Sequence, residues 1–249
     1  MSNDSSLIFG RHPVLDAINN GVTVEKVILL EGTRGEVEKE FRYLCREKGI
    51  PMTFAPRERM NKMASGANHQ GVMAFQSSIV YYDLVDIIQG AYERGEMPLI
   101  LLLDNITDVR NIGAIARSAE VFGAHAIVVP QQGGALINGE AIKSSAGALS
   151  IIPVCRVKSI HAAATALAEA GIQLFGGDLK ATKLLHQLEL NQPCAFLLGS
   201  EGRGLHPSLL KLTDDRFLIP QYGTTDSLNV SVSAGLMLYE AIRQRNFGN

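Results

Sequence analysis

Five short and almost continuously apolar segments lie between residues 98 and 220. Their sequences are LILLLD, HAIVVP, IQLFGG, CAFLLG and RFLIP. This pattern is typical of strands that are buried on both faces, as in a parallel sheet. Helical patterns at 112–122, 139–149 and 159–170 separate these segments, and a last one follows Ser227. The alternation predicts a doubly wound α/β domain, whose ligands bind outside the carboxyl ends of the strands.

A smaller alternation of the same kind occupies residues 11–77. It predicts helices at 12–20, at 35–48 and from residue 56 onward, and strands at 24–30, 51–54 and 71–76. The segment 81–97 is polar and charged and contains two glycines. We therefore expect two α/β domains, at 1–80 and 98–249, joined by a linker at 81–97 that contains a short helix.

The segment 227–236, SLNVSVSAGL, alternates polar and apolar residues like a strand, yet it leads directly into a helical pattern at 237–245. Ser, Asn and Gly are weak helix formers. Small side chains in the first turns of a helix let another backbone or a ligand approach closely, and the free N–H groups there bind polar atoms. Two interpretations are compatible with each other: a capped helix with a small-residue packing face, and a ligand site.

Composition excludes few classes of protein. The chain has 249 residues, 46% of them apolar, and a formal net charge of −2. A protein that binds nucleic acid by charge alone is usually basic, so composition does not indicate such a protein. The longest apolar run is too short to span a bilayer, and the N-terminus lacks a signal-peptide pattern. We expect a soluble cytoplasmic protein.

Cysteine and histidine give no sign of a metal site. Cys45, Cys155 and Cys194 are far apart and form no CxxC pair, which favours small buried side chains in a reducing compartment. The six histidines show no ligand spacing, so we expect no metal.

Polar loops follow three of the predicted strands. The residues of the first loop that can form helix caps and Asx turns are Asp104, Asn105, Asp108 and Asn111. Arg117 lies six residues after Asn111, on the second turn of the predicted helix. It is either a functional group or a surface arginine that pairs with Glu120, three residues on.

The second loop, LGSEGRGL at 198–205, has three glycines in six residues, so its backbone either bends tightly or is approached closely. Its order, GxxGxG, is that of neither a dinucleotide fingerprint nor a P-loop, and Glu201 would repel a phosphate. A cationic or hydrogen-bond-donating ligand fits better, and a plain tight turn is the alternative. The third loop runs from Leu218 to Asn229 and enters the small-residue segment.

Together, the three loops resemble the motifs of the SpoU (TrmH-type) family of RNA 2′-O-ribose methyltransferases, within the SPOUT superfamily. The matching stretches are Asn105 to Arg117, GSEGRGL at 199–205, and IP at 219–220 with SLNVS at 227–231. FGRHPVLDAI at 9–18 and HQGV at 69–72 are similar to the bounds of the RNA-binding domain of many members. The two-domain plan is similar to that of RlmB-like members, which methylate a guanosine ribose in 23S rRNA.

The resemblance implies a fold and a set of site residues. The fold is α/β: a small N-terminal domain like ribosomal protein L30e, and a C-terminal SPOUT domain with a deep trefoil knot. S-adenosyl-L-methionine would lie in the knot, and the implied cofactor-binding residues are Leu198, Gly199, Ile219, Leu228 and Ser227. The implied catalytic residues are Arg117, Glu201, Asn229 and Asn111.

The resemblance also implies a homodimer through the catalytic domain, in which Arg117 completes the partner's site, and neither a membrane nor a metal is needed. The arginine is expected nearest the ribose 2′-hydroxyl; because a guanidinium is a poor base, we favour stabilisation of the developing alkoxide and positioning. An RNA substrate, rRNA rather than tRNA, would be recognised by the front domain. Its candidate contacts are Arg11, Arg57, Arg59, His12 and His69, for which a solvated or structural role is the alternative.

Two other functions remain open at this point. A tRNA ribose methyltransferase has the same motifs, and a non-catalytic RNA-binding protein of this fold would be expected to lack Arg117, Glu201 or Asn229. The near-neutral chain predicts shape-led RNA binding with a modest dependence on salt.

Overall fold

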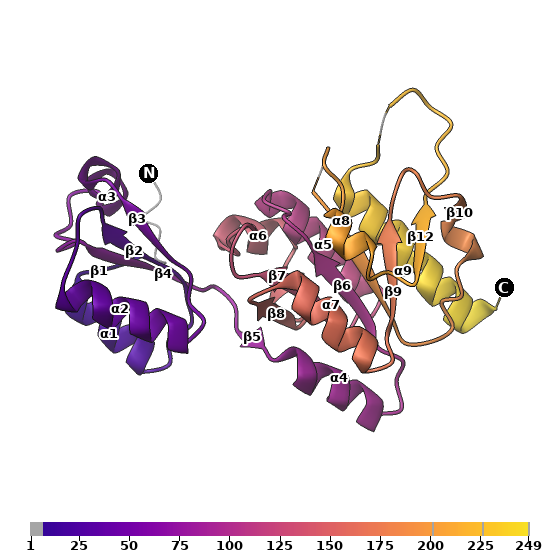
Figure 1. The fold of residues 1–249 in the computed structure, drawn as a ribbon, viewed down its shortest axis with the longest axis horizontal. Helices are drawn as coiled ribbons and strands as arrows, with labels where there is room; N and C mark the ends of the chain where they lie inside the picture. The colour runs from indigo at the N-terminus through magenta and orange to yellow at the C-terminus, as the bar shows by residue number, and fades with distance from the viewer. Residues whose placement is uncertain (1–6, 201, 226, 249) are drawn as a thin grey trace. The chain divides into compact units, whose positions relative to one another are not determined.

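The computed structural model describes residues 7–200, 202–225 and 227–248. The chain divides into two compact units after Val80. Each unit has its own sheet and its own core, so each is described by itself (Figure 1).

The first unit is a four-stranded sheet with helices on both faces. Its strands are β1 (Leu7–Phe9), β2 (Val24–Leu30), β3 (Met52–Ala55) and β4 (Val72–Gln76), in the order β1-β4-β2-β3. The helices are α1 (Arg11–Asn19), α2 (Glu36–Glu47) and α3 (Arg57–Ala64). Because side chains alternate along β2, Val27 and Leu29 face the core of α1 and α2, whereas Ile28 packs with Met60 of α3.

The second unit has an eight-stranded sheet in which all pairings are parallel, in the order β10-β12-β9-β11-β6-β7-β8-β5. The strands are β5 (Tyr81–Tyr82), β6 (Leu99–Leu103), β7 (Ala126–Pro130), β8 (Val154–Val157), β9 (Gln173–Gly177), β10 (Lys183–Leu184), β11 (Cys194–Leu198) and β12 (Asp215–Leu218). All residues of β6 and β11 are buried, which confirms the pattern expected of a parallel sheet.

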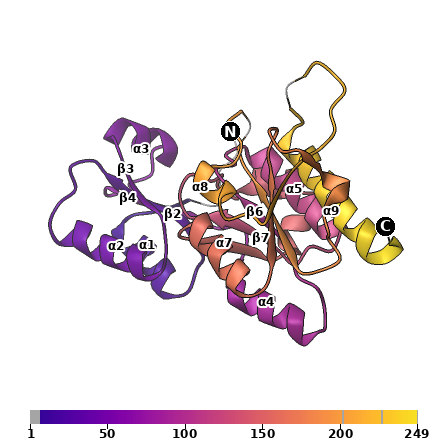
Figure 2. The ribbon, with the colours of Figure 1, turned by 45° about the vertical axis from the view of Figure 1, so that its right-hand side comes forward.

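Helices cover both faces of this sheet. The helices are α4 (Leu84–Glu93), α5 (Val109–Val121), α6 (Gly139–Ser144), α7 (Ile160–Glu169), α8 (Pro207–Leu210) and α9 (Val230–Phe247), with 3-10 turns at Ala148–Ser150 and Leu185–Gln187. Helices α4, α7 and α8 share one core with Ile100 and Leu102 of β6, and α5 packs against α6 and α9 (Figures 1 and 2).

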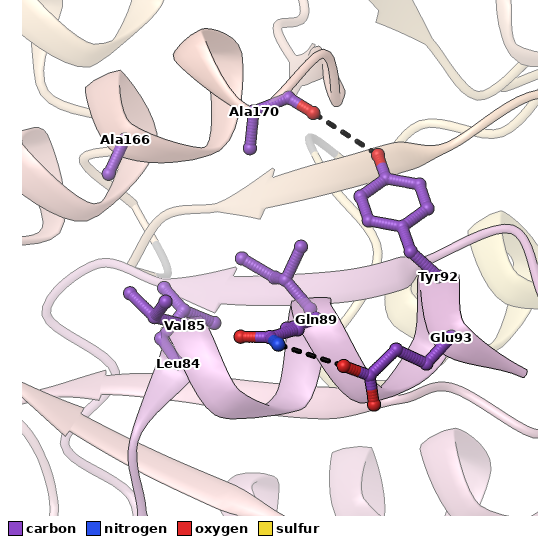
Figure 3. Close-up of a pocket in the computed structure, with 8 residues that line it drawn as sticks. Leu84, Val85, Gln89, Tyr92, Glu93, Ala166 and Ala170 are labelled. Atoms are coloured by element: carbon purple, nitrogen blue, oxygen red, sulfur yellow. Dashed lines mark hydrogen bonds between the residues drawn. The ribbon is translucent and has the colours of Figure 1, made fainter.

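The segment 81–97, expected to be a linker, belongs to the second unit. It contains β5, which pairs with β8, and α4, whose Leu84 and Ile88 are buried in the core of that unit. Figure 3 shows where α4 meets α7: the Tyr92 hydroxyl donates to the Ala170 carbonyl at 3.2 Å, and a shallow apolar cavity of about 500 Å³ lies between the helices. Sequence polarity concealed this docking because only one face of α4 is apolar.

The helix expected at 139–149 is shorter than predicted, because α6 ends at Ser144. Ala146 and Gly147 follow with φ of 51° and 90°, which are left-handed conformations that end a helix. A 3-10 turn completes the segment. The chain there is a capped turn, which hydrophobic periodicity alone does not distinguish from continued helix.

The small residues at the start of α9 serve packing against α5. Helix α9 packs along α5, and a Cβ on Gly235 would lie 3.5 Å from the Ser118 hydroxyl of α5, an ordinary contact distance. The three cysteines are buried and free, as predicted, and burial raises the pKa of Cys45 to about 11, of Cys155 to about 12 and of Cys194 to about 11. These thiols are therefore inert side chains of the core.

Candidate active site at the carboxyl ends of the strands

The structure joins two of the three polar loops through a buried carboxylate, Asp104, directly after β6. Its backbone N–H donates to the Leu198 carbonyl at the end of β11, at 2.7 Å. Its side chain accepts from the His206 backbone N–H at 3.3 Å and from the Asn105 amide at 2.8 Å. Asp104 thus connects the loop after β6 to both ends of the glycine-rich loop after β11.

The glycine-rich loop folds back on itself. The Gly204 N–H donates to the Ser200 carbonyl at 2.9 Å, and a Cβ on Gly199 would lie 2.1 Å from the Gly204 carbonyl carbon. Gly202 and Gly204 have φ of 82° and 66°, in the left-handed region that favours glycine. Both expectations for this loop, a tight bend and a close backbone approach, are confirmed, and Glu201 lies outside the described residues.

Two helix N-termini meet beside these loops. Asp108 caps α5 by accepting from the Arg110 N–H at 2.8 Å, and Asn229 caps α9 by accepting from the Ser231 N–H at 2.9 Å. The side-chain amide of Asn229 also donates to Asn111 Oδ1 at 3.0 Å. Asn111 and Asn229 are 118 residues apart in sequence, so this bond joins the first polar loop to the third.

Arg117 lies on the exposed surface of α5. Among the described residues, its guanidinium has neither a hydrogen-bond acceptor nor a carboxylate within ion-pair distance, so the pairing with Glu120 is not formed. It is also not hydrogen-bonded to Asn111 or Asn229. The structure therefore brings the two asparagines together and leaves the guanidinium available to another molecule.

The expected cofactor-binding residues present backbone groups at these loops. Leu198 is buried at the end of β11, Ile219 is half-buried after β12, and Ser227 and Leu228 are exposed before α9. The backbone N–H and C=O groups of Gly199, Ile219 and Leu228 have no hydrogen-bond partner in the described part of the chain. Loops at the ends of strands commonly carry the groups that bind ligands, and these unpaired backbone groups can bind the polar atoms of a ligand.

Asp104, His206 and Asn105 hold the loops together, and sequence reasoning did not assign them this role. Asn105 has a φ of 56°, and Gly133 approaches it so closely that a Cβ there would lie 2.6 Å from the Asn105 side-chain oxygen. The available signal was the position of Asp104, the first polar residue after a five-residue buried strand. A pattern cannot show that such a residue turns inward and becomes a cross-link.

In the first unit, the structure separates the candidate RNA contacts. His69 is buried: its Nδ1 accepts from the Gly71 N–H at 3.0 Å, so Nε2 carries the proton toward Asn61 Oδ1 at 2.9 Å. His69 therefore has the structural role that was the alternative to RNA contact. Arg11 pairs with Glu40 at 2.9 Å.

Three of the candidates remain accessible. Arg57 and Arg59 are exposed on α3, and His12 is exposed on α1. These side chains are the ones among the predicted RNA contacts that a polyanion can reach without breaking an internal bond.

In the described ranges, no cluster of three or more metal-ligating side chains is found. None of the helices described is long and apolar enough to cross a membrane.

Two family models match the chain. Residues 98–239 match the SpoU rRNA methylase family, and residues 7–79 match a domain described as RNA 2′-O ribose methyltransferase substrate binding. The boundary between the two matches lies close to the boundary between the two structural units.

Individual relatives agree with these matches. The chain is 33% identical to a putative TrmH family tRNA/rRNA methyltransferase, YacO, of Bacillus subtilis, over 99% of this chain and 98% of the relative. The SpoU methyltransferase AviRb of Streptomyces viridochromogenes, solved with AdoMet, is 27% identical, with a TM-score of 0.59 over 96% of this chain and 90% of that one. A TrmH/SpoU tRNA-modifying enzyme of A. aeolicus is 26% identical, with a TM-score of 0.55 over 60% of this chain and 76% of the other. The chain therefore belongs to the SpoU family and is an S-adenosylmethionine-dependent RNA methyltransferase.

Proposed function

We propose that the enzyme methylates the 2′-oxygen of a ribose in RNA, and that its target is a guanosine of 23S rRNA. The observation that carries the proposal is the bond between Asn111 and Asn229 beside the folded-back loop at Gly199, which gathers three distant motifs at one edge of the sheet. Ligands of doubly wound domains bind at this edge.

The residues at this edge fit S-adenosylmethionine, which supplies an activated methyl group when bound. The free backbone groups of Gly199, Ile219 and Leu228 can bind its polar atoms, and the Leu198 and Leu228 side chains can pack against its apolar parts. Gly199 can serve this purpose only as glycine, because the space a side chain would need is taken by Gly204. Leu198, Gly199, Ile219, Ser227 and Leu228 are therefore the proposed binding residues.

Arg117 is the proposed catalytic residue nearest the ribose. An exposed guanidinium without an internal partner can donate hydrogen bonds to the 2′-oxygen as negative charge develops there. Asn229, held by Asn111 and by the first turn of α9, positions the loop around the reacting atoms. Glu201 keeps its proposed role in the site, on the ground of the family motif alone.

The proposed assembly is a homodimer through α5 and α9. Val232, Leu236 and Tyr239 lie at helical spacing on α9 and are exposed, and Val121 is exposed on α5. An apolar stripe on packed helices suits a two-fold interface, in which the same surface meets itself. Such an interface would let Arg117 of one protomer serve the other. The trefoil knot implied by the family also remains a proposal.

An rRNA target is favoured by the description of the family model that matches the second unit, the SpoU rRNA methylase family. The similarity to the tRNA-modifying enzyme covers only 60% of this chain. The first unit, which matches a substrate-binding domain, is the proposed site of substrate recognition. A tRNA ribose remains the second candidate.

Mapping ribose methylation in rRNA and tRNA from cells that lack the protein tests this function. Loss of one 2′-O-methylguanosine from 23S rRNA, restored by the wild-type gene and not by an Arg117→Ala variant, is the expected result. Loss of a tRNA mark would replace the proposed substrate with the second candidate. Unchanged methylation in both RNAs would contradict the proposal.

A further inference from the structure

A polar pocket, separate from the apolar cavity between α4 and α7, lies at the edge of the sheet formed by β10 and β12. Figure 1 shows these two strands beside each other. Its volume is about 740 Å³, and segments 180–183, 210–211 and 213–216 line it. Four of the lining side chains are cations: Lys180, Lys183, Lys211 and Arg216. We call this site the cationic pocket. None of the residues proposed for methyl-donor binding or for catalysis that the structure describes lines it.

The charge of the cationic pocket is opposite to that of the unit that contains it. Residues 81–249 hold thirteen Lys and Arg against sixteen Asp and Glu. In the pocket, four cations face two carboxylates, those of Asp214 and Asp215. A local excess of positive charge within an acidic unit is an electrostatic feature that a polyanion can recognise.

Two carboxylates at this edge hold backbone in place. Asp178 Oδ1 accepts from the Lys180 N–H at 2.9 Å, and the Asp178 N–H donates to the Phe217 carbonyl at 2.9 Å. Asp214 Oδ2 accepts from the Leu174 N–H at 2.8 Å. These bonds tie the two loops that carry the lysines to the neighbouring strands.

The four cations differ in how they are neutralised. Lys183 pairs with Asp215 at 2.6 Å, and Arg216 lies 3.5 Å from Asp178. Lys180 and Lys211 are exposed, and within the described ranges no carboxylate lies within ion-pair distance of either. Two uncompensated ammonium groups thus face one space from two separate loops.

We infer that the cationic pocket binds the phosphodiester backbone of the substrate RNA, with Lys180 and Lys211 as its main contacts. The inference rests on the proposed function for the identity of the ligand. Contacts to phosphate carry no sequence information, but they fix how a nucleic acid lies on a protein. The pocket would therefore position the RNA on the methyltransferase unit while the first unit contributes recognition.

Salt dependence of RNA binding measures these contacts directly, because each phosphate contact releases counterions. The experiment compares full-length wild-type enzyme with Lys180→Ala/Lys211→Ala, using a labelled 23S rRNA transcript. The control Arg94→Ala/Arg110→Ala removes the same net charge from exposed ion pairs elsewhere in the unit. The expected result is a log–log salt slope smaller by about 1.5 and binding weaker by about tenfold or more at 0.1 M salt, in the pocket variant only.

Further arms separate the inference from its competitors. Lys180→Arg/Lys211→Arg should restore the wild-type slope, and the pocket variant should bind S-adenosylhomocysteine normally and reach the wild-type kcat at saturating RNA. Equal slopes for the pocket variant and the control would overturn the inference. So would saturable binding of inorganic phosphate to wild type, lost in the pocket variant, that leaves RNA binding unchanged at constant ionic strength, since the pocket would then be a small-anion site that RNA does not occupy. If wild type methylated no RNA, the proposed function would fail, and the slope comparison would still decide the pocket.

Discussion

The two ends of the parallel strands in the second unit differ in how their backbone groups are satisfied. At the amino ends, the last turn of α9 closes the sheet: the Arg245 guanidinium donates to the carbonyls of Met97, Leu190 and Gln192 at 2.8, 3.1 and 2.6 Å. At the carboxyl ends, the backbone groups of Gly199, Ile219 and Leu228 have no such partner in the described residues.

The two ends of the sheet therefore have different roles, one in stability and the other in function. The Arg245 guanidinium donates its hydrogen bonds to carbonyl groups of the chain, so it stabilises the amino ends of the strands and is not available to bind a ligand. Free backbone groups contribute nothing to the fold at the carboxyl end and are available to bind. The same helix, α9, serves both ends, because its first turn carries Asn229 and its last turn carries Arg245.

The largest effect is expected at Arg117. The Arg117→Ala variant should lose about 10²- to 10³-fold in kcat, the range measured when a single donor to a developing oxyanion is removed. Binding of S-adenosylhomocysteine should be nearly unchanged, because the side chain is exposed and has no internal partner. Steady-state methylation assays at saturating RNA and S-adenosylmethionine measure kcat, and calorimetry measures the affinity for S-adenosylhomocysteine. Arg110→Ala, on the same helix and exposed, is the control and should retain activity; full activity of Arg117→Ala would remove this residue from the mechanism.

Gly199→Ala should weaken S-adenosylhomocysteine binding by roughly 100-fold, or about 2.7 kcal/mol. The new Cβ would overlap the backbone of Gly204 and force the loop apart. Gly223→Ala is the matched control: it lies in the loop after β12, its φ is not in the left-handed range, and no atom lies within 4 Å of the added Cβ. Similar affinities for the two variants, measured by calorimetry, would show that the folded-back loop is not part of the site.

At the amino ends, Arg245→Ala should lower the free energy of unfolding by about 2–3 kcal/mol, because several carbonyls lose a charged donor. For a chain of this size the melting temperature should fall by roughly 5–10 °C. Arg110→Ala removes an exposed ion pair with Glu140 and should cost under about 1 kcal/mol. Thermal unfolding of Arg245→Ala and of the control variant measures both changes in stability. Equal decreases in melting temperature would mean that the Arg245 hydrogen bonds do not stabilise this end of the sheet.

The smallest effect concerns His125, at the same end. Burial lowers the pKa of His125 below its usual value, although Glu96 opposes the shift. The unfolded chain therefore binds the proton more tightly, and this contribution to stability is present above pH 6.5 and is lost as the pH falls toward the lowered value. His125→Asn keeps an acceptor for the Leu99 N–H and removes the titration. Its stability should depend less on pH between 7 and 5 than that of wild type; an identical dependence in urea unfolding would contradict the assignment.

Sequence patterns predicted the buried parts of the fold more fully than its edges. The strands β6, β7, β9, β11 and β12 coincide with the five apolar segments, because burial on both faces leaves a continuous signal. The short strands β5, β8 and β10 lack that signal because their residues are only partly buried. They become strands by pairing with a neighbouring strand, which a sequence pattern does not show. The packing of α4 was missed for the same reason, because the partner of its apolar face, α7, is distant in sequence.

For the site, patterns identified which loops matter but not how they are held. Asn111 and Asn229 were expected in one site on family resemblance, and their hydrogen bond is a fact of three-dimensional packing. The role of Asp104 as a cross-link depends on an inward turn that no local pattern specifies. The cationic pocket was likewise invisible, because its lysines come from two loops separated by about thirty residues of chain and only the sheet edge brings them together.

Hydrogen exchange of backbone amides with and without S-adenosylhomocysteine tests the difference between the two ends of the sheet most directly. We expect slower exchange at residues 198–200, 219 and 227–229 when the ligand is bound, and no change at residues 96–98 and 190–193. Protection confined to the amino ends of the strands, or to the cavity between α4 and α7, would contradict this expectation.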